Sequence, residues 1–161
     1  MPKLRDLVRM DDQEVEDYVC RQRDMHVSTL NLDGSVHMTT NWFAIDDGRI
    51  VFNSYESSQK IVNLRRDPRI TVLFASGDSY RELAGVSIRG TVRFADDPNE
   101  NLRLLQLIAE RNDAFVDRSV TGEATPENKA PKRICALIEP LKTISWNHAR
   151  LPLIKPDSKG V

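Results

Sequence analysis

Asn53-Ser-Tyr-Glu-Ser-Ser-Gln-Lys60 is where a strand pattern gives way to a helix pattern. The preceding Arg49-Ile-Val-Phe52 is apolar and rich in β-branched and aromatic residues, which is typical of a strand. The following residues place Ile61 and Leu64 three apart and end in two arginines, which is typical of a short helix. We therefore expect a strand-to-helix corner, with a helix over 57–66, Ser57 as its N-cap and Ser58 in its first turn.

Such a corner can bind an anion. The first turn of a helix presents unpaired N–H groups and partial positive charge, and phosphate groups bind readily there. The hydroxyls of Ser57 and Ser58, the exposed amides and the amine of Lys60 together predict a phosphate-binding site. The same spacing also fits a simple helix cap beside a solvated lysine, because caps of this kind are common. The pattern alone leaves both readings open.

The flanking sequence predicts an antiparallel meander. Asp33-Gly34 is a strong hairpin signal between strands over 25–32 and 36–45, and Asp46-Asp-Gly48 makes the next turn. Further strands are expected over 69–75 and 86–94, where Gly90 on the apolar face suggests a bulge or a close backbone approach. Helices are expected over about 12–22, capped by Asp11 or Asp12, and over about 96–117. The last strand, 134–146, is expected to break at Glu139-Pro140, after a loop over 118–132 that has room for one helical turn.

This pattern indicates one fold class. About six strands with short antiparallel connections outnumber three helices, and no βαβ alternation is sustained. The expected fold is mainly β (α+β): a six-stranded antiparallel barrel with peripheral helices, in a single domain over 1–150. Residues 151–161 are expected to form a loosely held C-terminal tail.

Composition narrows the classes of function. The chain has 161 residues, 40% hydrophobic and 29% charged, with a net charge of −1, so we expect a globular protein and no nucleic-acid partner. No apolar run approaches the roughly 20 residues of a membrane span, and no secretory signal is expected. Cys20 and Cys135 show no pairing or metal spacing, which favours a cytoplasmic location, with Cys20 a buried thiol.

Other chemical motifs are weak. His26, His37 and His148 are too scattered to predict a metal site. Ser57-x-x-Lys60 matches one motif of the penicillin-binding enzymes, but the companion motifs are lacking, so we regard the match as accidental. Trp42 has Thr39, Thr40 and Asn41 beside it, the mixture that a planar ligand needs, although composition alone favours a core position.

The order of these motifs resembles the split β-barrel flavin and deazaflavin oxidoreductases, the superfamily that includes pyridoxamine 5′-phosphate oxidase. Within it, the chain is similar to the actinobacterial branch that uses coenzyme F420, a 5-deazaflavin. The segments that carry the resemblance cover roughly residues 20–150: Asp33-Gly34 with Thr39-Thr-Asn-Trp-Phe43, Ser58-Gln-Lys60 with Asn63-Leu-Arg-Arg-Asp-Pro-Arg69, Gly85-Val-Ser-Ile-Arg-Gly90, and Lys132-Arg133 leading to Ser145-Trp-Asn-His148.

The resemblance implies a homodimer with two cofactor sites at the subunit interface. The cofactor would be coenzyme F420, or FMN as the alternative, and the partner a small unsaturated organic molecule. The family's phosphate corner falls on Ser57, Ser58, Gln59 and Lys60. The strands beside the ring system fall on Thr40, Asn41, Trp42, Phe43, Asn53 and Ser54.

The resemblance leaves three functions open. The first is hydride transfer between reduced F420 and its substrate; the others are an FMN-dependent oxidase or reductase, and a non-catalytic flavin-, F420- or haem-binding module. The chain departs from many relatives in lacking an arginine just before the lysine segment, and in carrying Asn147 where they have an aspartate. No catalytic residue is assigned: Tyr80 and His148 are candidate proton donors by chemical type only, and solvent could serve instead.

Overall fold

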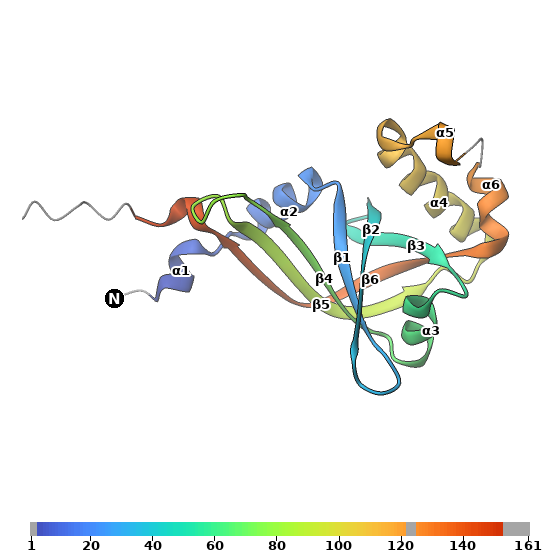
Figure 1. The fold of residues 1–161 in the computed structure, drawn as a ribbon, viewed down its shortest axis with the longest axis horizontal. Coiled ribbons are helices and arrows are strands. Elements are labelled where there is room, and N and C mark those ends of the chain that lie inside the picture. Colours follow the sequence, from blue (N-terminus) through green and yellow to red (C-terminus); the bar gives the residue numbers. More distant parts are fainter. Residues whose placement is uncertain (1–2, 122–124, 153–161) are drawn as a thin grey trace, which may run out of the picture.

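The computed structural model describes residues 3–121 and 125–152. Its strands form a closed antiparallel barrel in the order β1-β2-β3-β6-β5-β4 (Figure 1). The strands are β1 Asp24–Leu30, β2 Val36–Asp46, β3 Arg49–Tyr55, β4 Arg69–Ser76, β5 Ala84–Phe94 and β6 Arg133–Asn147. The mainly β, six-stranded barrel expected from the sequence is therefore confirmed.

Helices surround the barrel at its two ends. Figure 1 shows α4, α5 and α6 gathered at one end, whereas α1 and α2 lie toward the other, beside the extended ends of β4, β5 and β6. The helices are α1 Leu4–Val8, α2 Asp12–Arg21, α3 Gln59–Arg66, α4 Pro98–Asn112, α5 Arg118–Thr121 and α6 Pro126–Lys129. Short 3-10 turns cover Asp113–Phe115, Ala130–Lys132 and His148–Arg150. Most of the expected tail, residues 153–161, lies outside the described residues.

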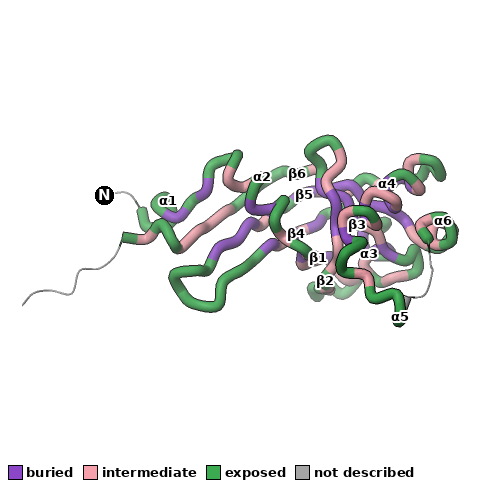
Figure 2. The backbone as a smooth tube through the Cα atoms, turned by 90° about the horizontal axis from the view of Figure 1, so that it is seen from above, coloured by how far each residue is buried: buried purple, intermediate pink, exposed green. Residues whose placement is uncertain are grey.

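Two apolar clusters form the core. The larger fills the barrel and includes Met25, Val27, Phe43, Phe52 and Phe74, all nearly or fully buried. In the smaller cluster, residues of α4 such as Leu104 and Ile108 pack against Val51 and Leu137, which lie on β3 and β6. Figure 2 shows the buried segments running along the strands, with the turns exposed. The alternation of side chains along each strand sends neighbouring residues into different clusters.

Local signals explain the element boundaries. The Asp11 carboxylate accepts from the Glu14 amide and the Glu14 side chain accepts from Asp11, a capping box that starts α2 as expected. Gly34 and Gly48 adopt positive φ in the two hairpin turns. Within 118–132, expected as a loop, the described residues include α5, α6 and a 3-10 turn.

The expected break at Pro140 is wrong, because β6 is continuous. The register with β5 shifts between Arg89 and Gly90, so that Leu141 is the extra residue of a β-bulge. The bulge requires glycine at position 90, since a Cβ there would lie 2.2 Å from the Glu139 carbonyl oxygen. The expected bulge or close approach at Gly90 is therefore confirmed, and the bulge accommodates Pro140 within a continuous β6.

The prediction that Cys20 is a buried thiol is also wrong, because its side chain is exposed.

Candidate functional site

The corner between β3 and α3 has the expected shape but a different cap. Ser58, not Ser57, is the N-cap of α3: its N–H donates to the Tyr55 carbonyl and its own carbonyl accepts from Ile61. The Ser58 side chain makes no cap hydrogen bond and instead lies 3.0 Å from the Ser54 hydroxyl. Because Ser54 is buried at the end of β3, this contact selects Ser58 over Ser57. The pair of hydroxyls at the corner is thus Ser54 and Ser58.

Lys60 brings positive charge to this pair of hydroxyls. Its amine donates to Ser54 Oγ at 3.4 Å, and the side chain is half-buried. Burial lowers the pKa of the Lys60 amine below its usual 10.5, and the positive charge of Arg133 lowers it further. Within residues 3–121 and 125–152, Lys60 takes part in none of the ion pairs. A half-buried cation beside two hydroxyls, without a carboxylate, is arranged to accept an anion.

A buried polar network fixes α3 against the first hairpin. Asn63 is fully buried, and its amide nitrogen donates to Thr29 Oγ1 at 3.1 Å and to Asn31 Oδ1 at 2.9 Å. Its oxygen accepts from Gln59 Nε2 at 2.9 Å. Since Asn63 lies one turn after Lys60, these bonds hold the start of α3, and with it the lysine, in a defined position.

A cavity of about 310 Å³ opens beside the corner. Four predicted site residues line it: Thr40, Asn41, Trp42 and Asn53. The remaining lining residues are Asp24, Ile108 and Arg133. Asn41 Nδ2 donates to the Asn53 carbonyl at 3.1 Å and so ties β2 to β3 at the cavity wall. The cavity combines a flat indole with amide and hydroxyl groups, as a planar polar ligand requires.

The structure separates other predicted residues from this cavity. Phe43 does not line the cavity: its ring is fully buried in the barrel, 5.0 Å from the Phe74 ring, with the Arg111 guanidinium 4.1 Å from its centroid. Its neighbour Trp42 lines the cavity, whereas Phe43 packs in the core of the barrel. Ser57 and Gln59 are exposed, and the Gln59 amide is engaged by Asn63.

Arg133 was not predicted as a site residue. It begins β6 opposite Tyr55 of β3 and is a lining residue of the cavity. Its Nη1 donates to Asn53 Oδ1 at 2.9 Å. The sequence marks it only as part of the Lys132-Arg133 segment of the family resemblance, because its place beside Asn53 depends on the pairing of β3 with β6.

The two candidate proton donors pair with each other elsewhere. The rings of Tyr80 and His148 lie 4.7 Å apart, and His148 Nδ1 lies 2.9 Å from the Tyr80 carbonyl oxygen. Neither residue lines the cavity beside Asn41. The geometry therefore does not connect either of them with the site.

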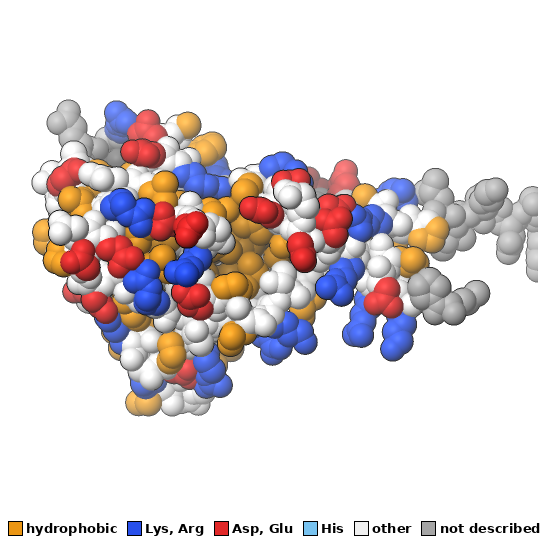
Figure 3. Space-filling view, turned by 180° about the vertical axis from the view of Figure 1, so that it is seen from behind, with side chains coloured by type: hydrophobic (Ala, Val, Ile, Leu, Met, Phe, Trp, Pro, Cys, Tyr) orange, Lys and Arg blue, Asp and Glu red, His pale blue; other side chains and the backbone are white. Residues whose placement is uncertain are grey.

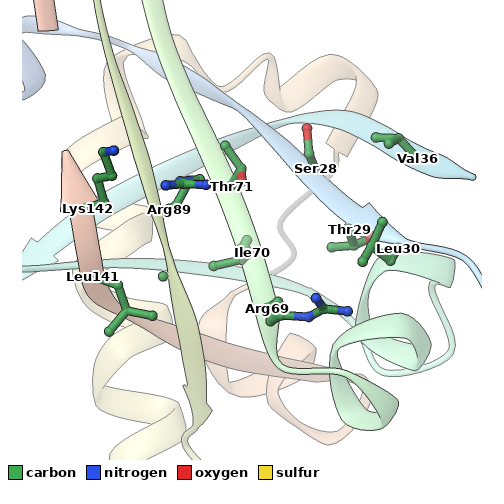
Figure 4. A pocket seen from close by; sticks show the side chains of 11 residues that line it. Ser28, Thr29, Leu30, Val36, Arg69, Ile70, Thr71, Arg89, Leu141 and Lys142 are labelled. Carbon is green, nitrogen blue, oxygen red and sulfur yellow. The ribbon is translucent and has the colours of Figure 1, made fainter. Parts of the chain in front are cut away.

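A larger cavity of about 410 Å³ lies on the outside of the barrel (Figure 4). Its walls come from β1, β2, β4, β5 and β6, and Arg89 and Lys142 face each other there on adjacent strands. Leu30, Val36, Ile70 and Leu141 make it mainly apolar. Because the smaller cavity has the Asn41 and Asn53 amides beside the Trp42 indole, we place the candidate site there.

No metal centre or membrane span accompanies this site in the described chain. Residues 3–121 and 125–152 contain no group of three or more histidine, cysteine or acidic residues placed to hold a metal ion. Over the same residues, every helix is too short or too polar to cross a bilayer.

The barrel and the corner beside it define a class of protein, the split β-barrels that bind flavins. Residues 11–137 match the family described as Pyridoxamine 5′-phosphate oxidase. The chain therefore belongs to the pyridoxamine 5′-phosphate oxidase family. No curated protein matches it.

Solved structures agree with this assignment. The conserved hypothetical protein Rv2991 from Mycobacterium tuberculosis is 32% identical, with a TM-score of 0.80 over 99% of this chain and 98% of that one. An F420 reductase is 21% identical, with a TM-score of 0.62 over 80% of this chain and 94% of that one. HutZ, the heme storage protein from Vibrio cholerae, is 9% identical, with a TM-score of 0.62 over 84% of this chain and 96% of that one. The last two likenesses concern the fold.

Proposed function

We propose that this protein is an oxidoreductase that transfers a hydride between reduced coenzyme F420 and an unsaturated small organic substrate. The observation that carries the proposal is the Lys60 amine, half-buried beside the Ser54 and Ser58 hydroxyls at the end of β3, where the preceding residue, Asn53, lines the Trp42 cavity. The fold shared with an F420 reductase supports the deazaflavin, and the family supports FMN as the alternative. A cytoplasmic location remains part of the proposal.

The residues present fit a phosphorylated ring cofactor. The Nε of Arg133 is buried, and no hydrogen-bond partner for it exists among the described residues. Buried polar groups in native proteins are nearly always paired, so this N–H is suited to an acceptor that a ligand brings. Lys60, Ser54 and Ser58 supply further donors at the same corner. The donor set is that of a phosphate site.

The chain's own residues bind and orient the cofactor. Lys60, Ser54 and Ser58 would hold its phosphate end, and Asn41 and Asn53 would contact the edge of its ring system. Trp42 would form an apolar wall that excludes water, which strengthens the polar contacts inside. When bound, the cofactor supplies two-electron hydride chemistry, whereas the protein contributes position and electrostatics.

Cofactor titration tests the proposal. Purified protein is titrated with F420 and, separately, with FMN and haem, following fluorescence or absorbance. Micromolar or tighter binding of F420 with much weaker FMN binding supports the deazaflavin reductase, and reduced F420 should then be oxidised by unsaturated acceptors. The reverse preference makes the protein an FMN enzyme. A protein that binds haem alone, or binds a cofactor without turnover on any acceptor, is a binding module instead.

The affinity for the phosphorylated cofactor should depend on pH through Lys60. The free amine has a lowered pKa, and a bound anion raises it again. Binding is therefore strongest while Lys60 is protonated in the free protein, and it weakens as the pH rises through the lowered pKa toward 10.5. We expect this decline in titrations across the alkaline range. In Lys60→Arg, which stays charged, this alkaline decline in affinity should disappear. If the variant shows the same decline as the wild type, Lys60 is not the titrating group.

We also propose a homodimer with the cofactor sites at its interface. The barrel face around the larger cavity exposes Val36 (61%), Leu141 (77%) and Ile144 (49%). Figure 3 shows that hydrophobic side chains gather in a hollow in the middle of the molecule. Thr40 lines the smaller cavity and its hydroxyl lies 3.2 Å from His26 on this same outer face. The face and the site are thus continuous at Thr40.

Sedimentation equilibrium should find a dimer at micromolar concentration. Leu141→Asp should weaken it by roughly tenfold or more, because a charge buried without a partner is costly. The same variant should lose F420 affinity if the site is shared between subunits. A wild-type monomer with full F420 affinity contradicts the shared site.

A further inference from the structure

The outer cavity, about 410 Å³ in volume, is lined by a row of polar side chains that crosses four strands. Ser28 of β1 stands opposite Thr71 of β4 in the strand pairing. Thr71 stands opposite Arg89 of β5, which in turn stands opposite Lys142 of β6. Residues directly opposite each other carry their side chains on the same face of a sheet, and Figure 4 shows the four in this order. Two hydroxyls and two cations therefore lie side by side on the outside of the barrel.

Both cations of this row lack a counter-ion. No ion pair in the described part of the chain includes Arg89 or Lys142, and none of the described residues that line the cavity is acidic. Arg69, the third cation of the lining, differs because its guanidinium lies 2.6 Å from the Asp67 carboxylate. Like charges directly opposite each other on adjacent strands destabilise a sheet. An anion bound between Arg89 and Lys142 would offset this repulsion.

The β-bulge of β6 is what places the second cation in the row. The pairing of β5 with β6 passes from Arg89 opposite Lys142 to Gly90 opposite Pro140, which leaves Leu141 as the extra residue. Without this extra residue, Leu141 and not Lys142 would stand opposite Arg89. Bulges often re-aim a side chain beside a functional site. Here the bulge puts two cations next to each other and leaves Leu141, 77% exposed, in the lining of the cavity.

Apolar side chains make up much of the remaining lining. Leu30 and Val36 stand opposite each other at the end of the hairpin between β1 and β2, and Ile70 and Leu141 add to them. A small-molecule site typically has about 300–1,000 Å³ of mainly apolar space with a few convergent polar groups. The outer cavity has this size and this composition. Its lining suits a ligand with an apolar body and one negatively charged end.

We propose that the outer cavity binds a small amphiphilic carboxylate, such as a medium-chain fatty acid. The carboxylate would lie between Arg89 and Lys142, beside the Thr71 hydroxyl, because the planar guanidinium matches a carboxylate and the ammonium adds a point charge. The hydrocarbon chain would lie along Leu30 and Val36. The site is separate from the one proposed for the cofactor, since no described residue lines both cavities.

The homodimer that we propose uses the same face of the barrel. An interface that buries charges without partners pays a large desolvation cost, so Arg89 and Lys142 would oppose association while they have no counter-ion. A bound carboxylate supplies one. The alternative occupant of the cavity is the second copy itself, with no ligand between the two chains, and the test below separates these cases.

Calorimetric titration with three probes tests the site. Octanoate supplies both the charge and the apolar body, octanamide keeps the body without the charge, and acetate keeps the charge without the body. We expect the wild-type protein to bind octanoate about tenfold or more tightly than octanamide, the usual value of a charge-assisted hydrogen bond, and to show no measurable affinity for acetate. Equal affinities for octanoate and octanamide overturn the proposal. Absence of octanoate binding also overturns it and leaves the face to the second copy.

Variants of the two cations locate the binding. Arg89→Gln and Lys142→Gln should each lose about tenfold in octanoate affinity and keep the weaker affinity for octanamide. Both side chains are exposed, so we expect the variants to fold. Lys132→Gln removes a charge from an exposed side chain outside the cavity and should bind as the wild type does. Unchanged octanoate affinity in both cavity variants removes the cations from the site. Sedimentation of the same samples should find one oligomeric state, and a loss of affinity that appears only with dissociation overturns the charge contact.

F420 separates this site from the proposed cofactor site. Octanoate should bind equally well to protein saturated with F420, and Arg89→Gln should bind F420 as the wild type does, because the two cavities share no described lining residue. If F420 displaces octanoate, the outer cavity belongs to the cofactor and is not a separate site. If the wild type binds no deazaflavin or flavin but binds octanoate as expected, the proposed function fails and this site stands.

Discussion

Lys60→Ala should weaken the binding of F420 by about 1.5–3 kcal/mol, or roughly 10- to 150-fold, the usual value of a hydrogen bond to a charged group. The variant removes the amine that lies 3.4 Å from Ser54 Oγ and leaves the two hydroxyls in place. Fluorescence titration of both proteins at the same pH measures the change. Lys132→Ala, an exposed lysine, should bind as the wild type does.

Although Lys60→Ala should weaken F420 binding, it should not lower the stability of the ligand-free protein. Burial and the neighbouring Arg133 both disfavour the charged amine, so its loss should leave the unfolding temperature unchanged or raise it. This combination is typical of a binding residue that is held in an unfavourable state until its ligand arrives. Unchanged affinity together with a large loss of stability would make Lys60 a structural residue and leave the phosphate corner without its main cation.

The barrel could be predicted because its signals are local. Asp33-Gly34 and Asp46-Asp-Gly48 mark tight hairpins, and the alternation along residues 86–94 marks a strand with one buried face. Pro140 gave the wrong prediction for a physical reason: a proline weakens a strand unless a bulge accommodates it, and this bulge depends on Gly90 of the paired strand.

The site could be predicted only in part. Ser57 and Ser58 are equivalent as caps in the sequence, and the contact of Ser58 with buried Ser54 decides between them. Arg133 reaches the corner through the pairing of β3 with β6, which no local pattern reveals. Lys60, Asn41 and Trp42 were predicted because their residue types lie within the two segments that build the corner and the cavity wall, and their contact with a cofactor stays a prediction.

Truncation of the adjacent β2 residues Trp42 and Phe43 should affect different properties, F420 affinity for Trp42 and stability for Phe43. Phe43→Ala should lower the free energy of unfolding by about 3–5 kcal/mol, because it removes a fully buried ring from the barrel core beside Phe74. Trp42→Ala removes a partly exposed cavity wall, so it should cost less stability and reduce F420 affinity more. Urea unfolding and F420 titration measure both quantities, with Phe43→Leu as a milder core variant that stays folded for the titration.

The comparison decides which aromatic residue serves the cofactor. Trp42 lines the cavity and Phe43 is fully buried in the barrel, so a ligand in the cavity can contact the indole but not the phenyl ring. If Phe43→Leu binds F420 normally while Trp42→Ala does not, the cavity beside Lys60 holds the ring system. If Trp42→Ala loses stability and keeps its affinity, Trp42 belongs to the core, and the ring must bind elsewhere, with the outer cavity around Arg89 and Lys142 as the next candidate.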